Sequence, residues 1–130
     1  MARTKKENTD EIIQEEWNLP VKKEIVETWI DEYGKIYKSV IDGDIYLWRR
    51  LKRSEYINII TDEDLNSITN NQVKIFKRQE MITEKSVLYP SNIASIFENS
   101  AGLATVLSDE IILNSGFDMP STESIGDVND

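Results

Sequence analysis

The chain contains neither cysteine nor histidine among its 130 residues. Without cysteine there are no disulfide bonds, no thiolate catalysis and no cysteine-ligated metal site. Without histidine the most common general base and the most common zinc ligand are missing. The sequence also lacks a phosphate-binding glycine loop, a nucleophile elbow and a zinc-protease helix motif. We therefore expect a protein that is not an enzyme and that holds no metal or cofactor.

Long apolar runs are also missing. No segment approaches the roughly 18 apolar residues of a membrane-spanning helix. The basic residues near Met1 are not followed by the hydrophobic stretch of a secretory signal. We expect a cytosolic protein with no membrane partner.

Acidic residues are in excess: 24 aspartates and glutamates oppose 15 lysines and arginines, giving a net charge of −9. Such a balance keeps a protein soluble and repels nucleic acid and anionic membranes. The length suits one domain with one core. We expect a globular domain over residues 21–117, a partly flexible N-terminal segment over 1–20 and an acidic flexible tail over 118–130.

The clearest turn signal is Asp42-Gly43, which lies between alternating apolar residues. Both central residues of a type I′ turn need positive φ, so Asp-Gly favours a two-residue hairpin loop. The loop fixes the strand pairs: Ile41 with Asp44, Val40 with Ile45, Ser39 with Tyr46, Lys38 with Leu47 and Tyr37 with Trp48.

The two faces of this hairpin differ in composition. One carries Val40, Ile45 and Leu47, and we expect it to pack on a helix over residues 22–33. The other carries Tyr37, Tyr46 and Trp48, which together with Arg50 we expect near the surface. Arginine with tryptophan and tyrosine is the composition of interface hot spots. These four residues form our predicted partner-binding site.

The remaining segments are predicted to be helical. A short helix is expected from Thr9 to Trp17. Further helices are expected at residues 22–33, 54–60, 72–85 and about 102–114. Ser54 is the expected N-cap of the helix over residues 54–60. Val87 to Pro90 should close the helix over residues 72–85. The inward side of the last helix is expected to be Leu103, Val106, Leu107 and Ile111, and Phe117 should fold back after Gly116. The predicted fold class is α+β, a mostly helical single domain with one β-hairpin.

Two local patterns have competing interpretations. Asp62, Asp64 and Asn66 begin like a calcium loop, but the required glycine and glutamate are replaced by Ser67 and Val73, which favours a helix N-terminus. The basic run around the second strand is consistent with a solvated strand end, a protein interface or a nucleic-acid site. It comprises Arg49, Arg50, Lys52 and Arg53.

Three stretches resemble a family of small proteins encoded among the tail genes of tailed bacteriophages, the tail assembly chaperones. They are EIVETWIDEYGKIYKSVIDGDIYLWRRLKRSEY, then VLYP at residues 87–90, then SAGLATVLSDEIILNSGF at residues 100–117. The resemblance covers about residues 22–117. It implies a non-enzymatic protein of the host cytoplasm that holds the tape measure protein or tail tube subunits soluble until the tail assembles. The alternatives are a structural component of the virion, in its tail or baseplate, and a small nucleic-acid-binding protein.

Overall fold

The Asp42-Gly43 hairpin forms with the predicted register. The computed structural model describes residues 17–117, in which strands β1 (Ile36–Ile41) and β2 (Asp44–Arg49) run antiparallel. All five predicted pairs are present, and the pairing extends by one step to Ile36 with Arg49. Asp42 has φ 53° and Gly43 has φ 84°, as a type I′ turn requires. The predictions for the segment 1–16, including the helix after Thr9, and for the tail 118–130 lie outside the described residues.

A third strand completes the sheet. Strand β3 (Val87–Tyr89) lies beside β2, so the strand order is β1-β2-β3. Leu47 pairs with Tyr89 and Trp48 with Val87, with an irregularity between the two pairs. The segment follows the end of α5 at Ser86, as expected, but it also forms a strand that the sequence pattern does not predict. A segment of three residues is too short to show the alternation of apolar and polar residues that marks a strand. Three helices also separate it in the chain from β2, the strand with which it pairs.

Helices make up most of the described residues, and the α+β fold class is confirmed. The α-helices are α2 (Lys23–Tyr33), α3 (Arg53–Ile60), α4 (Glu63–Asn66), α5 (Asn71–Ser86), α6 (Ile93–Ile96) and α7 (Leu103–Ile112). A 3-10 turn, η1 (Phe97–Asn99), follows α6, and a π-helical turn, η2 (Leu113–Phe117), follows α7.

Side chains fix several helix ends where the sequence predicts them. The Asp62 carboxylate accepts a hydrogen bond from the Leu65 N–H at 2.9 Å, and the Asn70 side chain accepts one from the Val73 N–H at 3.0 Å. Asp62 therefore begins a helix, as its departure from a calcium loop indicates. Ser54 is not the cap of α3, because the helix already starts at Arg53, and the Glu55 carboxylate accepts from the Lys52 N–H.

The core joins one face of the sheet to the helices. Tyr46 and Trp48 of β2 belong to the same buried cluster as Leu103, Leu107 and Ile111 of α7. Leu47, on the opposite face of β2, is buried outside this cluster, as is Val26 of α2. Both faces of the central strand are therefore covered, and the main core forms on the face that we expected to be exposed.

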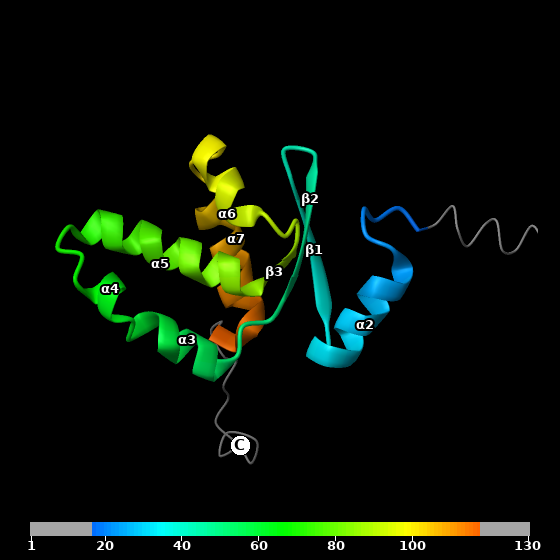
Figure 1. Ribbon diagram of the computed structural model, residues 1–130, viewed down its shortest axis with the longest axis horizontal. Coiled ribbons are helices and arrows are strands. Elements are labelled where there is room, and N and C mark those ends of the chain that lie inside the picture. The colour runs from blue at the N-terminus through cyan, green and yellow to red at the C-terminus, as the bar shows by residue number, and fades with distance from the viewer. Residues whose placement is uncertain (1–16, 118–130) are drawn as a thin grey trace, which may run out of the picture.

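Two groups of helices extend away from the sheet in opposite directions. Figure 1 shows α3, α4 and the first half of α5 projecting to one side of the sheet, and α2 on the other. We call residues 53–78 the helical arm. The buried residues of α5 are Ile82, Thr83 and Ser86, all beyond the arm, so the first half of this helix has no buried side chain, although Ile59 of α3 and Leu65 of α4 belong to the core cluster.

Candidate protein-interaction surfaces

The structure separates the four residues of the predicted partner-binding site. Tyr46 is 5% exposed and Trp48 is 2% exposed, so the expectation that these rings lie at the surface is wrong. Tyr37 is half-buried and stacks on Trp48, with ring centroids 4.4 Å apart. Only Arg50 is exposed, and its Nε donates a hydrogen bond to the Asn114 carbonyl at 2.9 Å. The four residues therefore offer no common binding face.

A polar chain explains how the aromatic face is buried. The Trp48 indole N–H donates to the Ser39 hydroxyl at 2.9 Å, and that hydroxyl donates to the Glu110 carboxylate on α7. Each buried polar atom in this chain thus has a partner, which removes the cost of burying it. Burial also raises the pKa of Tyr46 above its ordinary value, with a further contribution from the carboxylates of Asp44 and Asp42. The aromatic face of the hairpin is therefore part of the protein interior.

The basic run is divided in the same way. Arg49 is buried, whereas Arg50, Lys52 and Arg53 are exposed. A single-stranded nucleic acid needs aromatic rings on which bases can stack. Tyr46 and Trp48 offer none at the surface, so this segment lacks the stacking platform that the nucleic-acid interpretation requires.

Arg49 links the sheet to two helices. Its guanidinium forms a bidentate ion pair with Glu55 of α3, at 2.6 and 3.1 Å, and donates to the Lys85 carbonyl in α5 at 2.9 Å. The same group lies 4.9 Å from the centre of the Tyr33 ring at the end of α2. Burial acts to raise the pKa of Glu55, but the hydrogen bonds from Arg49 and the Lys52 N–H outweigh it and lower that pKa. The cluster fixes the direction of the arm.

A groove of about 300 Å³ opens where the arm leaves the core. Its apolar lining comes from Phe76 of α5, Phe97 of η1, and Ala101 and Ala104 near the start of α7. The Thr105 hydroxyl donates to the Gln79 side-chain oxygen at 2.7 Å, so these polar groups of the lining already bond each other. A segment bound in the groove would therefore make apolar contacts, and it would also meet the Glu80 carboxylate, which belongs to the lining.

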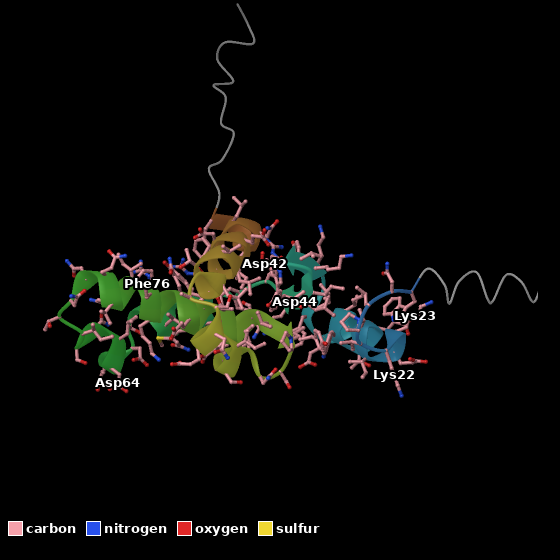
Figure 2. The ribbon with its side chains drawn as sticks, turned by 90° about the horizontal axis from the view of Figure 1, so that it is seen from above. Lys22, Lys23, Asp42, Asp44, Asp64 and Phe76 are labelled. Atoms are coloured by element: carbon pink, nitrogen blue, oxygen red, sulfur yellow. The ribbon has the colours of Figure 1, made fainter. Side chains whose placement is uncertain are left out.

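Phe76 is the most prominent residue of this groove. It is 47% exposed, although it lies on the side of α5 that turns toward α7. Figure 2 shows Phe76 on the arm, far from Lys22 and Lys23 at the other end of the described residues. Val73, one turn earlier on α5, is also exposed but does not line the groove. A large aromatic ring over a groove is a common anchor for a partner segment.

The outer side of α7 also differs from the prediction. Leu103, Leu107 and Ile111 are buried as expected, but Val106 is exposed, and Ala104 and Ser108 lie inside instead. Val106 is one turn before Glu110, which reaches back to Ser39 at the sheet. The predicted return of Phe117 is observed: its ring lies 4.9 Å from that of Tyr56, although Phe117 remains partly exposed.

A second hollow, of about 470 Å³, lies beside the hairpin turn. Its lining includes Pro20, Ile45, Tyr89, Pro90 and Ile96. It is wide and shallow, and Tyr46 reaches it only with the small exposed part of its ring. The groove at Phe76 is the better candidate because a large exposed aromatic side chain belongs to it.

Strand β1 is an edge of the sheet. In the strand order β1-β2-β3, β1 has a neighbour on one side only. On the face opposite Ser39 its side chains are poorly covered: Lys38 is exposed, and Val40 is 57% exposed. Figure 1 shows α2 close to β1 where the strand begins and diverging from it toward the turn. Most of this edge is therefore uncovered by the helix that precedes it.

Within residues 17–117, no group of three or more acidic side chains is arranged to hold a metal ion. In the same part of the chain, no helix is both long enough and apolar enough to span a bilayer.

Comparison with known proteins assigns no family. No protein-family model, no curated protein and no solved structure matches this chain.

Proposed function

We propose that this protein binds another polypeptide, and that the groove at Phe76 receives an apolar segment of that partner. The observation that carries the proposal is the uncovered first half of α5. The helix presents Ile75 and Phe76 on the arm, where neither is buried, while its buried residues all lie in its second half. An apolar helix face that projects beyond its own core is typical of a surface that another chain covers.

The class of partner is suggested by the sequence resemblance. We propose a role as a tail assembly chaperone of a tailed bacteriophage, acting on the tape measure or tail tube protein before the tail forms. Such partners expose apolar segments before assembly, and a groove that accepts them delays their aggregation. The net charge of −9 supports this role because it keeps a complex with an apolar client dispersed.

Phe76→Ser tests the groove. The protein is co-expressed with the tape measure and tail tube proteins of its own phage, and the affinity for the one that co-purifies is measured by calorimetry. We expect at least a tenfold loss of affinity, because truncating a buried aromatic anchor costs about 2 kcal/mol or more.

Val73→Ser is the matched control. It removes an apolar side chain of the same helix that is as exposed as Phe76 but lies outside the groove. We expect its affinity to equal that of the wild type, and both variants to keep the far-UV circular dichroism of the parent. Equal losses in both variants, or none in Phe76→Ser, would exclude the groove as the binding site.

The biological role is tested on purified phage particles by quantitative mass spectrometry. A chaperone leaves its client when the tail is complete, so we expect no stoichiometric copy of this chain in the particle. A fixed number of copies per particle would refute the chaperone role and identify a structural component of the virion.

A further inference from the structure

The outward-facing backbone groups of β1 form a row without partners. In a two-residue hairpin the flanking pair Ile41 and Asp44 is hydrogen-bonded, and bonded pairs then alternate along the ladder. Ser39 and Tyr37 are therefore bonded to β2, whereas Ile36, Lys38 and Val40 direct their N–H and C=O groups away from the sheet. The same alternation makes Leu47 face β3, where its pairing with Tyr89 is observed.

This row is free within residues 17–117. Outside the β1–β2 ladder, no backbone hydrogen bond in that range involves Ile36, Lys38 or Val40. Three alternate residues present six unpaired groups, enough to hold one added strand of similar length. The edge is neither bulged nor shielded by proline, and its residues IYKSVI favour an extended conformation.

Lys38 decides what can occupy the edge. It is the middle member of the row, and it is exposed. If a second copy of β1 added in antiparallel register to satisfy all six groups, Ile36 would face Val40 of the other copy. The two Lys38 residues would then face each other directly, which is destabilising. A register shifted by two residues removes that clash but leaves either Ile36 or Val40 without a strand partner, depending on the direction of the shift. Lysine at this position thus disfavours self-association and favours a carboxylate opposite.

We propose that β1 receives an extended segment of the partner polypeptide as a fourth strand, with an acidic residue opposite Lys38. Lys35, at the start of the strand, adds a second positive charge at that end, whereas Asp42 and Asp44 make the turn end negative. The segment therefore carries acid at its centre and toward the Lys35 end, and apolar or β-branched residues where it meets Val40. This inference rests on the proposed function for its premise that a protein partner exists, but the edge is separate from the Phe76 groove.

Two synthetic peptides serve as probes of the full chain. Both alternate threonine and valine, and they differ only in a central glutamate or a central lysine. Binding is followed by nuclear magnetic resonance of the backbone amides. We expect the glutamate peptide to shift and protect the amides of Ile36, Lys38 and Val40, and the lysine peptide to bind about tenfold more weakly. Equal binding of the two peptides, or shifts confined to other residues, would overturn the proposal.

Val40→Pro tests the edge in the complex with the natural partner. Proline removes the outward N–H of Val40, and an edge strand tolerates it where that N–H faces away from the sheet. Val40→Thr is the control, because it keeps the N–H and a β-branched side chain. We expect Val40→Pro to weaken partner binding at least fivefold and Val40→Thr to leave it unchanged. If the wild type binds a tail protein and Val40→Pro binds it equally, the strand addition is wrong while the proposed function stands. If the wild type binds none, the proposed function itself fails.

Sedimentation velocity tests the choice of a partner over a second copy. The wild type should remain monomeric, and Lys38→Val, which removes the opposing charges, should form dimers as concentration rises. A wild-type dimer that Val40→Pro dissociates would show that a second copy occupies the edge, and a Lys38→Val variant that stays monomeric would show that Lys38 does not control it.

Discussion

At the scale of single residues, the aromatic side chains of the hairpin serve the interior. Trp48 combines a large apolar ring with one N–H, and Ser39 and Glu110 satisfy that N–H inside the fold. The alternation of the strands predicts correctly that Tyr37, Tyr46 and Trp48 share a face. It does not predict which face the helices cover, because both faces carry apolar residues. Replacing Trp48 by alanine therefore measures stability more than binding.

Arg49 provides the sharpest stability test. Arg49→Met keeps much of the side-chain volume but removes the positive charge beside the partly buried Glu55 carboxylate, which keeps only the Lys52 N–H as a donor, and it removes the side-chain donor to the Lys85 carbonyl. We expect the free energy of unfolding in urea to fall by about 3 kcal/mol. The double variant Arg49→Met, Glu55→Gln should recover a large part of this loss, because no unpaired charge remains. A single variant as stable as the wild type would show that the ion pair is dispensable.

The same pair predicts a dependence on pH. Glu55 has its pKa lowered in the folded state, so its ionised form contributes stability at pH values above its ordinary pKa of about 4.5. That contribution disappears as pH falls through the lowered folded-state pKa. We expect the wild type to lose more stability than Glu55→Gln between pH 5 and the acid limit of folding, measured as urea midpoints across this range. Parallel curves for the two proteins would contradict the assignment.

At the scale of elements, the sequence predicts the structure correctly where one or two residues determine the local geometry. Asp42-Gly43 set the register of the hairpin, and Asp62 marked a helix N-terminus at the right place. The third strand and the exposed side of α7 were missed because tertiary contacts decide them. Val106 fits the apolar period of its helix as well as Leu107 does, and only the position of the sheet separates the two.

Gly43 offers a test of the turn alone. Its φ is +84°, and a Cβ built there would meet no atom within 4 Å, so any cost of alanine comes from the backbone. We expect Gly43→Ala to lower the free energy of unfolding by about 1 kcal/mol. Gly102 is the control: it has a right-handed conformation and equally open surroundings, so Gly102→Ala should stay within about 0.5 kcal/mol of the wild type. Thermal or urea unfolding distinguishes the two.

At the scale of the whole molecule, the sequence predicted the fold class and the single hairpin register, but not the arrangement of its surfaces. The proposed groove and the open strand edge lie on different elements, the arm and β1. Of the four predicted site residues, none lines the groove and only Tyr37 lies in β1. The sequence does not predict the exposure of Phe76, because an apolar residue at its position fits the stripe of α5 that would face the core. Its exposure results from the length by which α5 exceeds its neighbours.

If one partner contacts both surfaces, their effects should combine. Phe76 and Val40 share no element, so their separate losses in binding free energy should add in the double variant Phe76→Ser, Val40→Pro. We expect the double variant to lose affinity by the product of the two single-variant factors, measured by calorimetry on the same partner. A double variant no weaker than the worse single variant would show that the two surfaces do not act on one bound partner together.

The buried guanidinium of Arg49 would matter if one partner bound at both the Phe76 groove and the β1 edge. Since it joins the sheet to α3, to the end of α5 and to the ring of Tyr33, the spacing between groove and edge is set when the chain folds. If one partner binds at one of the two proposed surfaces, it would meet the other at a fixed separation, and the local concentration of the second contact would rise without any ordering of the protein. If the proposed partner contacts both surfaces, this fixed separation would favour polypeptides whose apolar and acidic stretches lie a matching distance apart.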